Sequence, residues 1–281
     1  MTATDDAVGL TALRKVDPDR YLATLYAPAD KRDALSALYL FNAEIAAIRD
    51  RVHEPLPGEI RLQWWRDALA GGRDAVAGHP LAMALARVID DHDLPLAAFD
   101  RYLEARIFDL YDDPMPSRAD LEGYCGETAS AVVQLAALIL EPEAAPQFSA
   151  ASGHGGCAIA ITGMLRQLPL HRARGQCFFP AEMLEAAGTS REALLSGDDN
   201  AAVQHAVEAM VALGREHLAR FGAEAGAMPV SLRPAFLPAA PVSAYLDRIA
   251  AHPSDALVRP TDISAIRRHW IMLRKATGGW G

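Results

Sequence analysis

Residues 39–50 read YLFNAEIAAIRD, a run without proline or glycine that predicts an α-helix. With roughly 3.6 residues per turn, positions four apart share a face, so Ala46 and Asp50 should lie side by side. Two carboxylates at these positions could hold a divalent cation between them. The sequence supplies only one of these two carboxylates, Asp50. The function of a site with a single carboxylate therefore has to be inferred from the rest of the chain.

The rest of the chain predicts an all-α fold. Alanine and leucine dominate, aromatic residues make up 7% of the chain, and β-branched runs are scarce. We expect residues 1–18 to be an N-terminal tail and residues 19–281 to be one domain of roughly ten helices. Proline and glycine punctuation places those helices at 29–52, 59–70, 80–92, 96–111, 120–140, 147–168, 181–187 and 200–224, with one or two more between 241 and 276. Residues 169–180, rich in arginine and glycine, are expected to be a loop.

Charge and targeting signals narrow the class of protein. The net charge of -9 argues against nucleic-acid binding, which needs a basic face. The opening MTATDDAVGL lacks the basic start of a secretion signal, and the apolar stretch 129–140 is shorter than the ~20 residues that cross a bilayer. We expect a cytoplasmic protein, and these signals are also compatible with a peripheral contact with a membrane.

The three cysteines, Cys125, Cys157 and Cys177, have neither the number nor the spacing of a disulfide framework or a zinc site. Reduced intracellular thiols are the expectation. Cys125 lacks a nearby partner in the sequence that would activate it as a nucleophile.

Three blocks resemble the squalene/phytoene synthase family, in the order found there. They are DRYLATLYAPADKRDALSALYLFNAEIAAIRD (19–50), LEARIFDLYDDPMPSRADLEGYCGETASAVV (103–133) and GHGGCAIAITGMLRQLPLHRARGQCFFP (153–180). The resemblance implies helices of the isoprenoid synthase type around a central cavity. It also implies two Asp-rich motifs on facing helices, which hold Mg²⁺ against the diphosphate of a prenyl substrate, because hard cations neutralise the charge of that leaving group.

This chain departs from that pattern at three of four positions. The first motif reads Ala46 and Asp50, and the second reads Gln167 and His171. A glutamine oxygen is a weak neutral ligand, and histidine suits softer metals than Mg²⁺. Asp50 and, with an altered geometry, Glu44 are the only metal ligands that we would assign, and we expect Mg²⁺ only if catalysis survives.

The second motif is cationic instead, with Arg166, His171, Arg172 and Arg174 close together in the chain. These side chains could bind a phosphate or another anion directly. Surface salt bridges are an equally good interpretation of the cluster.

The remaining motifs have mainly structural interpretations. Trp64 and Trp65 are expected to pack at the core and its rim rather than to stack on a ligand. Tyr124 should line or support the cavity, and it joins Asp50 as a candidate catalytic residue if the protein is active. We expect His154 to be structural or anion-binding. Asp109, Asp112 and Asp113 could bind a cation, but an acidic cluster before two prolines is more typical of a solvated loop.

One branch of the family fits better than the synthases. It departs from the Asp-rich motifs, serves in respiratory complex I assembly, and has sequences similar to Phe41, Asn42, Glu44 and Asp50 and to RLQWWRDAL. This resemblance implies a non-catalytic accessory protein with an assembly partner and an isoprenoid or phospholipid ligand. The alternatives are a prenyltransferase that condenses two prenyl diphosphates at an altered metal site, and a lipid carrier that grips a head group with its arginines.

Overall fold

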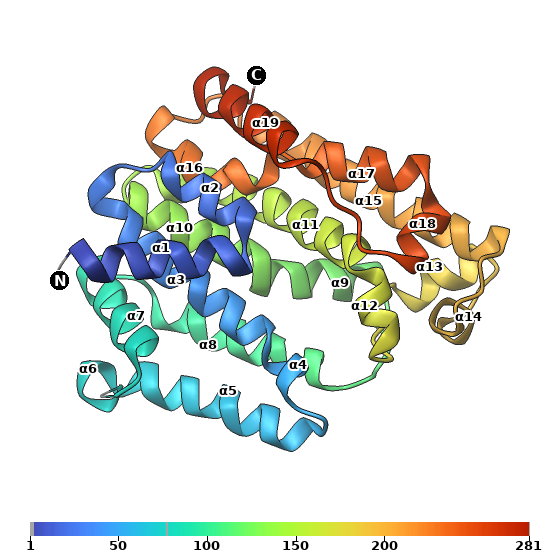
Figure 1. Ribbon diagram of the computed structural model, residues 1–281, viewed down its shortest axis with the longest axis horizontal. Coiled ribbons are helices and arrows are strands. Elements are labelled where there is room, and N and C mark those ends of the chain that lie inside the picture. The colour runs from blue at the N-terminus through green and yellow to red at the C-terminus, as the bar shows by residue number, and fades with distance from the viewer. Residues whose placement is uncertain (1–2, 77, 281) are drawn as a thin grey trace.

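The computed structural model describes residues 3–76 and 78–280, and almost all of them belong to helices or the turns between them (Figure 1). The α-helices are α1 (Ala3–Val16), α2 (Pro18–Leu25), α3 (Arg32–Ala46), α4 (Ile48–Arg51), α5 (Pro55–Ala70), α6 (Gly72–Ala75), α7 (Pro80–Asp91), α8 (Leu96–Ala105), α9 (Arg118–Cys125), α10 (Ala131–Leu140), α11 (Ser149–Arg166), α12 (Leu168–Ala173), α13 (Ala181–Ala186), α14 (Arg191–Ser196), α15 (Ala201–Glu224), α16 (Arg233–Phe236), α17 (Val242–Ala251), α18 (Pro253–Val258) and α19 (Ala265–Gly278). In the described part of the chain, extended pairing is limited to one isolated bridge between Met115 and Pro180. The all-α prediction is confirmed.

Helix α11 forms the centre of the bundle. It runs along α15 and α10, while α3 and α8 lie on the far side of α10 and α9 from α15 (Figure 1). Two apolar clusters hold the layers together: one joins Leu35, Phe41 and Phe99 with α10, and the other joins Ile161 and Met210 from α11 and α15.

The first residues form a helix instead of the expected tail. Helix α1 packs on α3, and Leu13 is fully buried in the larger apolar cluster. The acidic opening hid this helix, because Leu13, the buried apolar residue that docks it, comes late in the segment. The chain therefore contributes one more wall to the space beside α3.

Both helices that carry the motifs break at the motif. The expected helix 29–52 is divided at Ala47 into α3 and α4, and no residue type there accounts for the break. The second break, at Gln167, precedes Pro169, which cannot donate the next helical hydrogen bond. The prediction of a loop at residues 169–180 is wrong for its first part, because residues up to Ala173 belong to α12.

The stretch Arg118–Leu140 is continuous helix, with a π-helical segment at Gly126–Ser130 between α9 and α10. It is long and apolar enough to span a membrane, contrary to the expectation from 129–140 alone, but 61% of its most apolar window is buried inside the protein. Such burial is typical of a core helix. Its role here is to carry Tyr124 and Thr128 to the cavity.

Candidate functional site

A cavity of about 740 Å³ lies between α1, α3 and α4 on one side and α11 and α12 on the other. The π-helical segment and the turn after α8 form its floor. Its size is that of a pocket for a small organic ligand. Part of its wall is apolar, from Val16, Leu40, Leu81, Ile159 and Met164.

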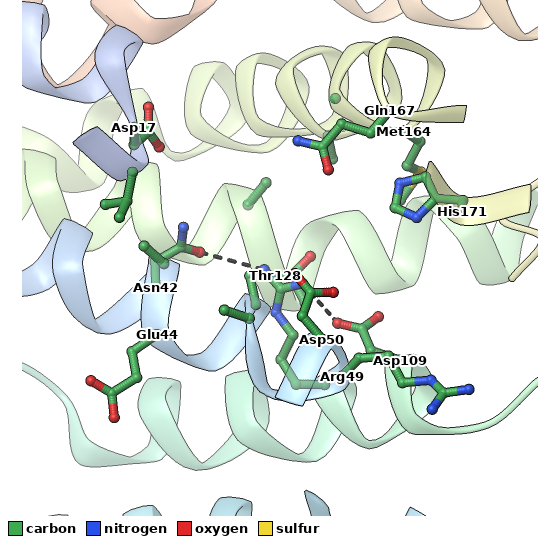
Figure 2. Close-up of a pocket in the computed structure, with 18 of the residues that line it drawn as sticks. Asp17, Asn42, Glu44, Arg49, Asp50, Asp109, Thr128, Met164, Gln167 and His171 are labelled. Atoms are coloured by element: carbon green, nitrogen blue, oxygen red, sulfur yellow. Dashed lines mark hydrogen bonds and ion pairs between the residues drawn. The ribbon is translucent and has the colours of Figure 1, made fainter. Parts of the chain in front are cut away.

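The four motif positions meet at this cavity. Ala46 and Asp50 line it from α3 and α4, and Gln167 and His171 line it from the α11–α12 junction. Figure 2 shows Gln167 and His171 on the wall opposite Asp50. The breaks in both helices therefore bring together the residues that the sequence placed in facing motifs.

Asp50, the one aspartate at the four motif positions, has its negative charge balanced by an arginine. Oδ1 of Asp50 lies 2.6 Å from Nη1 of Arg174, which follows α12 and also lines the cavity. The two side chains are 43% and 34% exposed, so the pair lies at the solvent-facing part of the cavity wall. A cation arriving at Asp50 would have to displace an arginine.

The other three wall carboxylates have cationic or imidazole partners as well. Asp17 pairs with Arg20 at 2.7 Å, and Asp109 pairs with Arg106 at 2.9 Å. Glu44 lies 3.6 Å from His79.

This donor set does not fit Mg²⁺, which requires several oxygen ligands in a near-octahedral shell. Among the described residues, no group of three or more His, Cys, Asp or Glu side chains is placed to hold a metal ion. The assignment of Asp50 and Glu44 as metal ligands therefore has no geometric support.

A polar network forms the floor. Arg106 donates to Asp109 at 2.9 Å, to the Tyr124 hydroxyl at 3.0 Å and to Asn42 Oδ1 at 3.4 Å. Figure 2 shows Asn42 and Asp109, two of these acceptors. The Tyr102 hydroxyl also donates to Asn42, at 3.0 Å. The network fixes the partly buried Arg106 guanidinium at the base of the cavity.

Tyr124 belongs to this floor as a hydrogen-bond donor. Its hydroxyl donates to Asp109 Oδ1 at 2.6 Å. Burial, together with the neighbouring Asp109 carboxylate, raises the pKa of Tyr124 well above its ordinary value. The phenol stays protonated at neutral pH and would act as a general base only at a large energetic cost.

His171 is held neutral. Burial, with Arg174 nearby, lowers the pKa of its imidazole. Its ring meets Phe178 edge-on, with centroids 4.9 Å apart. His171 thus presents a neutral aromatic surface to the cavity, and it does not add the positive charge that the sequence suggested.

The predicted cationic cluster does not assemble as one site. Arg166 turns away from the cavity, pairs with Asp19 at 3.3 Å and lies over the Tyr245 ring. Arg172 donates to the Leu257 carbonyl. Of the four residues, only His171 and Arg174 line the cavity, because successive positions on α12 point in different directions.

Glu44 also borders a smaller hollow of about 190 Å³, which it shares with Trp64, Trp65 and His79. Trp65 is buried against Phe41 with ring centroids 5.1 Å apart, while Trp64 is exposed at the rim. The division of the two indoles between core and rim is confirmed.

Sequence reasoning missed Arg106 and the structural part played by Asp109. Asp109 was expected to solvate a loop, but it is buried and receives hydrogen bonds from Arg106 and Tyr124. An arginine three residues before an aspartate on a helical segment is the signal that could have found this pair. Its burial depends on packing that the local pattern does not reveal.

Comparison with known proteins identifies the family and the fold of this chain. The family model for squalene/phytoene synthase matches residues 13–271, nearly the whole chain. The chain belongs to the squalene/phytoene synthase family. A dehydrosqualene synthase crystal structure superposes with a TM-score of 0.79 over 98% of this chain and 96% of that one, at 20% identity, and confirms the isoprenoid synthase fold.

Some relatives are more similar to this chain in sequence than the dehydrosqualene synthase is. NADH dehydrogenase (ubiquinone) complex I, assembly factor 6, of Rattus norvegicus is 32% identical over 85% of this chain and 72% of its own length. The Homo sapiens protein of the same name is 29% identical over the same shares. Both the synthases and these assembly factors are therefore relatives of this chain.

Proposed function

We propose that this protein is a non-catalytic member of the squalene/phytoene synthase family that holds an anionic amphiphile in its cavity and acts as an accessory factor in respiratory complex I assembly. The name of the 32% identical relative supports the second part. The pairing of Asp50 with Arg174 at 2.6 Å carries the first part. An internal cation in place of a metal suits anion binding without metal-assisted ionisation.

The amphiphile is inferred from the two kinds of wall. Leu40, Ile159 and Met164 offer an apolar surface for an acyl or isoprenoid chain. Arg174 and the exposed Arg51 lie where a charged head group would meet solvent. No ion pair involving Arg51 occurs in the described part of the chain, which leaves its guanidinium available to an anion.

Calorimetric titration with geranylgeranyl diphosphate tests the ligand class. We expect binding that is equal with Mg²⁺ and with chelator, and no conversion of the prenyl chain. A Gly163→Leu variant should abolish it, because Gly163 lines the cavity and a Cβ there meets open space, so that a larger side chain projects into the ligand volume. Gly222→Leu is the matched control, on α15 away from the cavity and equally unobstructed. Turnover at an ordinary enzymatic rate would refute the non-catalytic proposal.

The second candidate function is a prenyltransferase with an altered metal site. The retained cavity, with Asp50 on one wall and the second motif on the other, favours it. It requires Mg²⁺-dependent binding that disappears in Asp50→Ala. Identical binding with and without Mg²⁺ would exclude this candidate.

The assembly role has its own test. Deleting the gene from its native cell should lower the amount of assembled complex I while leaving squalene and phytoene levels unchanged. The Gly163→Leu variant should fail to restore assembly if the ligand is needed for it. Normal complex I in the deletion strain would contradict the role.

A further inference from the structure

Helix α19 presents an apolar stripe to solvent. Ile266, Trp270 and Leu273 are 83%, 60% and 41% exposed. At 100° per residue these three positions fall within about 60° of one another on the helix. In Figure 1 α19 lies along the outer edge of the molecule, on the opposite side from α5. The stripe is therefore a continuous outward-facing ridge.

The opposite side of α19 is firmly attached. Met272 is fully buried, and Arg268 pairs with Asp19 of α2 at 2.8 Å and with Asp262 at 2.6 Å. The Arg268 guanidinium also donates to the Tyr245 hydroxyl. Contacts on its inner side therefore fix the orientation of the helix. The same orientation exposes the apolar stripe to solvent.

The charged residues of α19 itself are all of one sign. Helix α19 contains Arg267, Arg268, Arg274 and Lys275 and no acidic residue, in a chain with a net charge of -9. Arg268 is committed to its acidic partners and Lys275 lies over the Trp280 ring at 5.2 Å. Arg267 and Arg274 are exposed and share one flank of the stripe, since they are seven residues apart.

A second exposed stripe serves as a contrast. Leu56, Ile60 and Trp64 are also exposed, four residues apart on α5. That helix carries Glu59 and Asp67 as well as its arginines, so its surroundings have both signs of charge. Of these two helices with an exposed apolar stripe, only α19 carries positive charge without acidic residues.

We propose that α19 docks this protein on an anionic lipid bilayer, with Ile266, Trp270 and Leu273 inserted at the level of the head groups and Arg267 and Arg274 beside lipid phosphates. A helix with an apolar ridge, a tryptophan and flanking arginines is suited to lie in the plane of such an interface. The proposal is independent of the cavity's ligand. It does not require the assembly role.

Co-sedimentation of the full chain with lipid vesicles tests the proposal. We expect binding to phosphatidylcholine vesicles containing ~30% phosphatidylglycerol and at least ~10-fold weaker binding to pure phosphatidylcholine, because the basic residues beside the stripe are attracted to an anionic surface. Raising the salt concentration should release the protein. Equal binding to both vesicles, or to neither, would overturn the proposal.

Two pairs of matched variants locate the surface. Ile266→Ser with Leu273→Ser should abolish binding, whereas Leu56→Ser with Ile60→Ser on α5 should leave it intact. All four side chains are exposed, so the variants should fold, and thermal unfolding checks this. Equal losses in both pairs would show that α19 is not the docking surface.

Charge variants distinguish an effect of the arginines on α19 from an effect of the protein's net charge. Arg267→Glu with Arg274→Glu should lower the partition coefficient at least ~10-fold. Arg61→Glu with Arg248→Glu makes the same change in net charge on exposed residues elsewhere and should have a much smaller effect. If the α19 variants keep vesicle binding but lose a protein partner in native membranes, α19 is a protein-docking helix and the bilayer proposal is wrong.

Discussion

Nη1 of Arg174 lies 2.6 Å from Oδ1 of Asp50, and this contact joins α4 to the end of α12 across the cavity. In a metal-dependent relative, carboxylates on the two sides would be joined through a cation. Here a guanidinium makes the connection directly, as an ion pair with the carboxylate. The pair balances the charge of the Asp50 carboxylate without Mg²⁺.

Replacing Asp50 by asparagine should strengthen the binding of geranylgeranyl diphosphate several-fold. The substitution removes the carboxylate that competes with the ligand's phosphates for Arg174. Titration calorimetry measures the affinity, and Arg174→Ala should weaken it. A metal-dependent enzyme predicts the reverse for Asp50, so weaker binding by Asp50→Asn would argue for the prenyltransferase.

The same pair should contribute little to stability. Both partners are more than a third exposed, and such ion pairs contribute about 0–1 kcal/mol. A double-mutant cycle with Asp50→Asn and Arg174→Gln, followed by urea unfolding, should give a coupling energy below ~1 kcal/mol. A much larger coupling would mean that the pair is a structural clamp rather than an exchangeable contact.

Restoring the carboxylates should restore metal dependence. In a variant with Ala46→Asp, Gln167→Asp, His171→Asp and Arg174→Ala, the two cavity walls would present four carboxylates including Asp50. We expect Mg²⁺ to tighten diphosphate binding by at least ~10-fold in this variant and to have no effect on the natural protein. The Arg174→Ala single variant is the control for removal of the arginine alone.

The fold and the convergence of the motifs were predictable from sequence, because helix period and motif order are local properties. Ala46, Asp50, Gln167 and His171 were placed on facing helices, and they do line one cavity. The family and the assembly-factor branch were also found by motif. These features depend on patterns that survive without knowledge of packing.

The charge of the site could not be predicted in the same way. Arg166 and Arg172 are close to Arg174 in sequence but leave the cavity, because their direction depends on where α11 breaks and on acceptors distant in the chain. Asp109 and Arg106 were overlooked for the same reason, since a short acidic run looks solvated until tertiary packing buries it. Local sequence gives the residue types at a site, and packing selects which of them face it.

Stability should fall as the pH is lowered through about 6.5, the ordinary pKa of histidine. Burial lowers the pKa of His217, whose Nδ1 lies 3.1 Å from Nδ1 of His154 and whose Nε2 lies 3.1 Å from Glu122. The unfolded chain therefore binds this proton first, and its uptake favours unfolding between the ordinary pKa and the lowered one. Urea unfolding from pH 7.5 to 5.5 should show a smaller slope for His217→Gln than for the natural protein. The exposed His53→Gln is the control, and an unchanged slope in His217→Gln would contradict the prediction.

Gly156 should be the least replaceable glycine of α11. A Cβ at this position would lie 2.3 Å from Cα and 2.4 Å from the backbone nitrogen of Ser130, in the π-helical segment of the cavity floor. Backbone cannot yield as a flexible side chain can, so Gly156→Ala should lower the free energy of unfolding by about 1–3 kcal/mol. It should also weaken ligand binding, because the segment that is displaced carries Thr128 to the cavity. Gly153→Ala, on the same helix with open space around its Cβ, should instead be neutral or stabilise by up to about 1 kcal/mol, since alanine favours helix more than glycine does. If both variants lost stability equally, close packing of α11 against the π-helical segment would not be what requires glycine at position 156.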